Sequence, residues 1–132
     1  SGGLIVAGNL TNYLESKLID HFLGTTTYTK PSAVYVGLFT VTPGEAGGGT
    51  EVTGGSYARQ AATFGAASSG ATTNSTNIDF AGMPAATTVA IGIFDAITSG
   101  NMLLYGGLTT NKTTDAGDTL RIATGSLSVS ID

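Results

Sequence analysis

The 132-residue chain contains no cysteine, no tryptophan and a single histidine, His21. Without cysteine, neither a disulfide nor a thiolate metal site holds the fold, and a cysteine nucleophile is excluded. A Ser–His–acid triad would have to use His21, and the sequence has no Gly-x-Ser-x-Gly elbow to carry the serine. His21 falls in a helical pattern beside Phe22, which favours a helix residue at the edge of the core. We therefore expect no catalytic residue, no bound metal, no cofactor and no enzymatic activity.

Charged residues are also scarce, at 11 % of the chain, with five Lys and Arg against nine Asp and Glu. The basic residues are scattered, whereas nucleic-acid binding needs a basic stripe that displaces counterions from phosphate. Apolar runs are short, as at Leu4–Ala7, so no segment is expected to span a membrane. The first residues also lack the pattern of a signal peptide. We expect neither nucleic acid nor membrane as a partner.

Glycine is abundant, with 20 residues, and the polar positions are filled mainly by threonine and serine. A helical protein normally solvates its outer face with Glu, Lys and Arg. A β protein can use threonine and serine for the same purpose. The composition therefore favours a mainly β fold.

One segment, residues 9–23, has the period of an amphipathic helix that packs one face on a core. Asn9 or Thr11 can cap its start, and Gly24 suits a left-handed cap at its end. Residues 1–8 precede it as a glycine-rich N-terminal arm with a single apolar triplet. The apolar residues that recur every four positions in the helix are Leu10, Leu14, Leu18 and Phe22.

From residue 25 onward the period changes to two, which predicts strands. The strongest candidates are 33–41 and 87–95, and a turn at Gly100-Asn101 followed by 102–108 predicts a hairpin. Residues 65–77 suit either a loop or a flat strand. Further strands are expected at 57–64, 78–80, 120–122 and 127–131, the last two as a pair. About seven or eight short strands with one N-terminal helix predict a β-sandwich or jelly-roll-like domain over residues 9–132.

Few polar groups suggest ligand chemistry. Asp115 and Asp118 share one turn, where capping of the turn backbone is favoured over calcium binding because the spacing does not match a calcium loop. Tyr28 and Tyr57 are the only tyrosines that suit a carbohydrate platform. The remaining features suit protein contact, because glycine loops let backbones approach and an apolar arm can dock on a neighbour. The expected contact residues are Leu4, Ile5 and Val6 in the arm and Gly47, Gly48, Gly49 and Glu51 in the loop 43–55.

Several segments resemble a group of short structural proteins of tailed bacteriophages, which are described as tail-fibre-like or simply as virion proteins. The resemblance is carried by residues 9–21, Val34-Tyr-Val-Gly-Leu-Phe-Thr40 and Gly54-Gly-Ser-Tyr-Ala-Arg-Gln60. It is also carried by Phe64-Gly-Ala66, Ile91-Gly-Ile-Phe-Asp-Ala96, Gly100–Gly106, Leu108-Thr-Thr110 and Leu127–Asp132. It covers nearly the whole chain from residue 9 and implies a place on the virion, with no catalytic residues.

The small size favours, among virion proteins, a capsid decoration (cement) subunit on the outer surface of the particle. Its partners would be the major capsid protein or other virion proteins and copies of itself, in a homo-oligomer. A tail-fibre or tail-associated protein is the alternative within the virion, and a carbohydrate-binding β-sandwich module is the alternative from another class.

Overall fold

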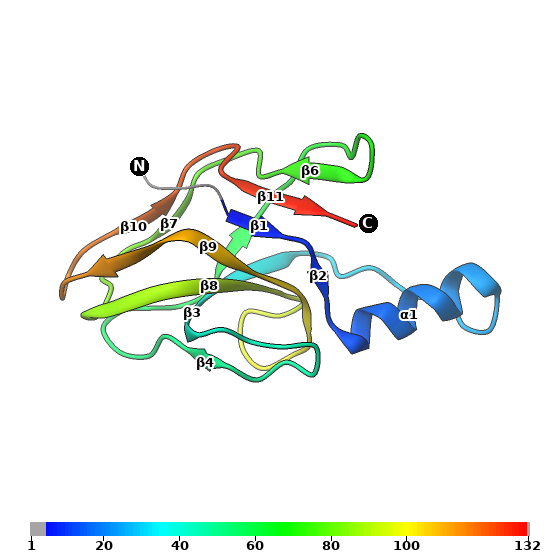
Figure 1. Ribbon diagram of the computed structural model, residues 1–132, viewed down its shortest axis with the longest axis horizontal. Coiled ribbons are helices and arrows are strands. Elements are labelled where there is room, and N and C mark those ends of the chain that lie inside the picture. Colours follow the sequence, from blue (N-terminus) through cyan, green and yellow to red (C-terminus); the bar gives the residue numbers. More distant parts are fainter. Residues whose placement is uncertain (1–4, 132) are drawn as a thin grey trace.

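A computed structural model of the chain describes residues 5–131 (Figure 1). It is mainly β, with one N-terminal helix among the described residues, as the sequence predicted. The elements are β1 (Ile5–Ala7), β2 (Asn9–Leu10), α1 (Asn12–Leu23), β3 (Val34–Val41), β4 (Thr50–Glu51), β5 (Gln60–Ala62), β6 (Ala71–Thr73), β7 (Ile78–Phe80), β8 (Ala86–Phe94), β9 (Met102–Thr114), β10 (Leu120–Ile122) and β11 (Leu127–Ser130).

The strands form two sheets in a β-sandwich-like arrangement. The larger sheet has the order β4-β3-β8-β9-β1-β11-β6, with β2 added beside β9 and β5 beside β3. The smaller sheet is the antiparallel pair β10-β7. Apolar side chains from both sheets meet in the main core, where Leu38 and Ile91 of the larger sheet are fully buried and Phe80 of the smaller one is 1 % exposed. The fold class predicted from the sequence is therefore confirmed.

The predicted hairpin forms from the two longest strands, β8 and β9. The alternation in β8 places Ile91 and Ile93 in the main core, while Ala90 and Phe94 enter a second cluster with Phe39. Both faces of this strand are thus covered, which explains its nearly continuous apolar sequence. β9 continues to Thr114, beyond the predicted end at 108, because residues 112–114 pair with residues 86–88 at the start of β8.

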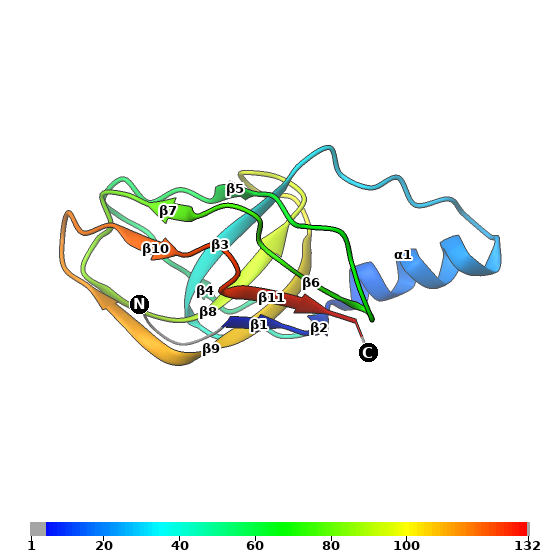
Figure 2. The same ribbon diagram turned by 90° about the horizontal axis from the view of Figure 1, so that it is seen from above.

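The predicted arm, residues 1–8, is in part a strand. β1 lies between β11, which is parallel to it, and β9, which is antiparallel (Figure 1, Figure 2). Ile5 is 5 % exposed and Ala7 is fully buried, so these two residues belong to the core. The glycines around the triplet suggested a free segment, but Ile5–Ala7 pair with β11, and Ile5 also pairs with β9, which satisfies backbone hydrogen bonds of β1.

The predicted pairing of the last two strands is wrong. β10 pairs with β7, opposite Ile78 and Phe80, while β11 pairs with β1 and β6. The buried Asn74 separates them: its side-chain oxygen accepts from the Leu127 N–H at 3.0 Å, and its amide donates to the Ala123 carbonyl at 3.0 Å. These bonds hold the chain between β10 and β11 in a turn that carries it from one sheet to the other.

The helix begins three residues later than predicted, because Asn9–Leu10 form β2 against β9. Thr11 is its N-cap: the hydroxyl accepts from the Leu14 N–H and donates to the Met102 carbonyl at 2.7 Å. Gly24 ends it in the left-handed conformation, as expected. With 12 residues, α1 is neither long nor apolar enough to cross a membrane, and no other helix occurs among residues 5–131.

The apolar face of α1 packs on the core only at its start. Leu14 is buried, and Leu18 is partly buried against the main cluster. Phe22, which the pattern also assigned to the core, is 74 % exposed, because the helix projects away from the sheets at one end of the molecule (Figure 1, Figure 2). The prediction of one continuous packed face is therefore wrong for the last turn.

Candidate functional site

The glycine loop after β3 is compact and held by its own backbone. Gly44 and Gly47 exchange two hydrogen bonds of 2.8 and 2.9 Å. Gly49 has φ +72°, and a Cβ there would lie 2.6 Å from the Val41 carbonyl oxygen, so only glycine fits this return of the chain. The Asn12 N–H donates to the Glu45 carbonyl at 2.8 Å. The loop is thereby tied to the first turn of α1.

All four loop residues predicted as contacts line one open cavity of about 600 Å³. We call it the glycine-loop cavity. Its floor is the second apolar cluster, with Phe39, Phe94 and Met102. The rest of its wall comes from the start of α1 and from the β8–β9 turn. The predicted residues in it are Gly47, Gly48, Gly49 and Glu51.

The other predicted contact residues lie elsewhere. Ile5 is 5 % exposed and belongs to the core, where it lines a different cavity, between β9 and β10. Leu4 lies outside the residues that the structure describes. Val6 belongs to β1, and its side chain is likewise outside the description. The structure thus brings the loop half of the predicted set together and separates it from the arm half.

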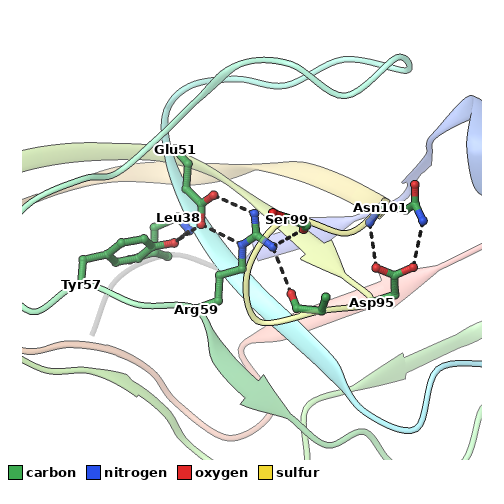
Figure 3. Close-up of polar contacts among 8 residues, drawn as sticks. Leu38, Glu51, Tyr57, Arg59, Asp95, Ser99 and Asn101 are labelled. Atoms are coloured by element: carbon green, nitrogen blue, oxygen red, sulfur yellow. Dashed lines mark hydrogen bonds and ion pairs between the residues drawn. The ribbon is translucent and has the colours of Figure 1, made fainter.

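Beside the cavity, Arg59 is the centre of a polar network that joins three segments (Figure 3). Its Nε and Nη2 donate to the two carboxylate oxygens of Glu51, each at 3.0 Å. Its Nη1 donates to the carbonyls of Ala96 at 3.0 Å and Ser99 at 2.8 Å. The guanidinium also lies 3.5 Å from the centre of the Phe94 ring, where a cation is attracted to the π face. One side chain thus fixes the β8–β9 turn against the loop that carries Glu51.

Tyr57 completes the network. Its hydroxyl donates to Glu51 Oε2 at 2.6 Å and accepts from the Leu38 N–H at 2.8 Å. The hydroxyl fills the gap between β4 and β5 on the edge of β3, where a backbone donor would otherwise be unpaired. Burial raises the pKa of Tyr57 far above its ordinary value, and the hydrogen bond to Glu51 raises it further. The hydroxyl therefore stays protonated and acts as a structural donor.

The network requires a glycine beneath it. A Cβ on Gly37 would lie 2.8 Å from Glu51 Oε2 and 3.2 Å from the Phe94 ring. Position 37 of β3 must therefore lack a side chain, because the Glu51 carboxylate crosses the strand there. Glu51, predicted as a contact residue, is held by Tyr57 and Arg59, and its side chain is 24 % exposed.

The remaining polar candidates have local structural roles. Nδ1 of His21 accepts the Tyr28 N–H at 3.1 Å, which ties the loop after α1 back to the helix. Asp118 accepts the Asp115 N–H at 2.7 Å, as expected for a turn cap. Tyr57 stacks on Phe80 and is committed to the network, so it is no free carbohydrate platform. No group of three His, Asp or Glu side chains that could hold a metal ion occurs within residues 5–131.

Two features were missed by the sequence analysis. Arg59 was quoted as part of a motif without a role, although an arginine in the middle of a charge-poor chain indicates that its charge has a partner. The exposed end of α1 was assigned to the core, because a helical period shows which residues share a face and not what covers that face.

The fold and these contacts define a small β-sandwich-like domain in which Arg59, Tyr57, His21 and Asp118 hold loops and turns in place. Residues 9–130 match the model of the family described as Podophage GP4 fiber I protein gp80. The match covers nearly all of the chain, which therefore belongs to this family and is a virion structural protein of the short-tailed phage, tail-fibre-like kind. No curated protein matches the chain.

Proposed function

We propose that the chain is a subunit of a tail fibre, exposed on the virion and acting through protein–protein contacts without catalysis. The family match over residues 9–130 carries this proposal, because the description of the family names a fibre. The geometry agrees with it. Glu51, Tyr57 and Arg59, which lie in or beside the glycine-loop cavity, bond to one another or to the backbone, so these polar side chains hold structure.

The glycine-loop cavity is the proposed contact surface for a neighbouring virion protein or a second copy. Its floor of Phe39, Phe94 and Met102 offers apolar area, and the Arg59 network keeps its walls rigid. A rigid surface loses little conformational entropy on binding. Leu4 and Val6 stay in the proposal as contacts of the N-terminal segment.

Contact at this cavity is tested by adding bulk at its rim. Ala46 is exposed and lines the cavity without touching the network. Phage lacking the gene and complemented with Ala46→Arg should contain little of the chain, whereas Ala66→Arg, at an exposed alanine outside the lining, should be incorporated like the wild type. The measurement is the amount of chain per purified particle by mass spectrometry. Equal incorporation of the two variants would move the contact to another surface.

Capsid decoration, which the sequence favoured, remains the second candidate. The short chain and its small cavity-bearing domain suit a repeated lattice subunit as well as a fibre piece. Quantitative mass spectrometry against the major capsid protein separates the two. A copy number near that of the capsid protein, or a simple fraction of it, indicates decoration. A handful or a few dozen copies per particle supports the fibre.

Carbohydrate binding is the candidate from another class. Tyr57 no longer supports it, but Tyr13 lies with Phe39, Phe94 and the amide of Asn101 in the glycine-loop cavity. Aromatic faces beside amide groups suit a sugar ring. If the isolated chain binds to a glycan array and Tyr13→Ala abolishes the binding, carbohydrate recognition replaces protein contact as the proposed role of this cavity.

A further inference from the structure

The last turn of α1 is an apolar surface without a partner in the described part of the chain. Ile19, Phe22 and Leu23 are 58, 74 and 78 % exposed, and their spacing places them on one side of the helix. Burying a side chain of this size is worth about 1.5–3 kcal/mol. A cluster of them on a projecting element is typical of a contact surface. We call Asp20, Phe22 and Leu23 the helix tip.

The same molecule has an open apolar cavity of about 420 Å³ between β9 and β10. It reaches into the main core, since Leu38 and Ile91 form part of its wall and are fully buried. A cavity of this size and character suits large apolar side chains, which anchor protein interfaces by filling such pockets. The other large apolar residues in its wall are Ile5, Leu108, Leu120 and Ile122.

The charges at the two places are complementary. Lys112 and Arg121 are the charged residues that line the cavity. Arg121 is already paired with Asp79 at 2.7 Å, while Lys112 has no ion pair within residues 5–131. On the helix, the carboxylate of Asp20 has no ion pair or hydrogen bond in the described structure either, and it lies one turn from Leu23. Opposite charges at a contact of this kind set orientation more than affinity.

The two features lie at opposite ends of the molecule. In both views α1 occupies one end of the long axis, and the β9–β10 turn occupies the other (Figure 1, Figure 2). A surface at one end that fits a cavity toward the other end joins copies head to tail, which gives rings or filaments.

We propose that the helix tip of one copy enters the β9–β10 cavity of the next copy, with Phe22 and Leu23 against its apolar wall and Asp20 paired with Lys112. This deepens the proposed structural role by naming a second copy as the partner. The contact is small, so isolated chains should associate weakly, with a dissociation constant in roughly the high-micromolar range. Several such contacts in one particle would act together.

The absence of cysteine allows a direct test by disulfide cross-linking. Purified Leu23→Cys chains are mixed with Ala123→Cys chains, since Ala123 lines the cavity, and are oxidised at high micromolar concentration. We expect the mixed dimer to form at least several times faster than with the control Ile97→Cys, which places a cysteine at an exposed position of the β8–β9 turn.

Charge reversal provides a second test, because cross-linking by random collision would not depend on the charges of Asp20 and Lys112. Lys112→Glu in the Ala123→Cys chain should slow formation of the mixed dimer roughly five-fold, and Asp20→Lys in the Leu23→Cys chain should restore it. Circular dichroism of each variant checks that it is folded.

Equal cross-linking by the Leu23→Cys and Ile97→Cys chains, or a rate that ignores charge reversal, would overturn the proposal and assign the helix tip to a different protein. The purified chain is tested without the particle, so a negative result leaves the location on the virion, and with it the fibre proposal, to be judged by copy number.

Discussion

At the scale of single residues, Arg59 is expected to contribute to stability through its ion pair with Glu51 and its hydrogen bonds to two backbone carbonyls. Its side chain is 10 % exposed and that of Glu51 is 24 % exposed, so the pair is more shielded than a surface ion pair. Removal of the guanidinium leaves two carbonyls without their donor, and it leaves the shielded Glu51 carboxylate with the Tyr57 hydroxyl but without its opposite charge. We expect Arg59→Met to lower the free energy of unfolding by about 2–3 kcal/mol in urea titrations.

Arg121 provides the matched control for this prediction. It also binds an acidic residue through two nitrogens, but its side chain is 58 % exposed and that of Asp79 is 42 % exposed. Water screens such a pair, so Arg121→Met should change the unfolding midpoint little. Equal losses of unfolding free energy in the two variants would show that the burial of Arg59 and its bonds to the loops add nothing to stability.

The Tyr57 hydroxyl gives stability a dependence on alkaline pH. Its pKa is raised in the folded chain, chiefly by burial and then by Glu51, whereas in the unfolded chain it ionises near pH 10. Folding therefore favours the protonated form. Its contribution is fully present below about pH 10 and is lost as the pH rises from there toward the folded pKa.

Tyr57→Phe should accordingly show a shallower fall in the free energy of unfolding above about pH 10 than the wild type. Urea titrations at a series of alkaline pH values measure the slope. Tyr105→Phe, on β9, leaves the Tyr57 hydroxyl in place and should keep the wild-type slope. An unchanged slope in Tyr57→Phe would mean that other groups dominate alkaline unfolding.

At the scale of elements, β1 is a core strand even though it stands near the start of the chain. Ile5 is paired with Leu127 on one side and Leu108 on the other, and it is 5 % exposed. Truncation of such a side chain leaves a cavity among neighbours that collapse only in part. Ile5→Ala should cost about 2–4 kcal/mol of unfolding free energy.

Ile19 offers the same substitution at an exposed position. Its side chain is 58 % exposed on α1, so Ile19→Ala should stay within about 0.5 kcal/mol of the wild type. Thermal or urea unfolding of the two variants makes the comparison. If the two losses are equal, β1 does not contribute to the core as described.

Elements whose signals are local could be predicted from the sequence. The limits of β3 and β8 to within a residue, the hairpin turn at Gly100-Asn101 and the helix cap at Gly24 depend on period and turn chemistry within a few residues. At the other end of the helix the sequence left the cap open between Asn9 and Thr11, and the structure selects Thr11. Strand partners could not be predicted in the same way, because they depend on distant segments. β1 was assigned to an arm and β10 to the wrong partner for this reason.

The candidate site shows the same division. The glycine loop was singled out because glycines let backbones approach closely, and it does line the glycine-loop cavity. The carboxylate of Glu51 is held by Tyr57 and Arg59, six and eight residues away, and the turn that Arg59 holds is about forty residues away in sequence. No local pattern reveals contacts across that separation.

At the scale of the whole molecule, the fibre and capsid proposals differ in what the particle loses without the chain. A decoration subunit resists the internal pressure of packaged DNA, so heads without it should release DNA at lower temperature. A fibre subunit bears no such load. We expect particles that lack the chain to release DNA at the same temperature as the wild type, as followed by a DNA-binding dye, while adsorption to host cells falls sharply.

Restoring the wild-type chain should recover adsorption, and the Arg59→Met chain should recover it less at elevated temperature, because its loops are held by fewer bonds. The Ala66→Arg chain, altered at an exposed position outside both proposed contact cavities, should restore adsorption fully. If instead the heads lose DNA early and adsorption is normal, the chain acts on the capsid. This chain would then belong to a family whose description names a fibre without itself serving as one.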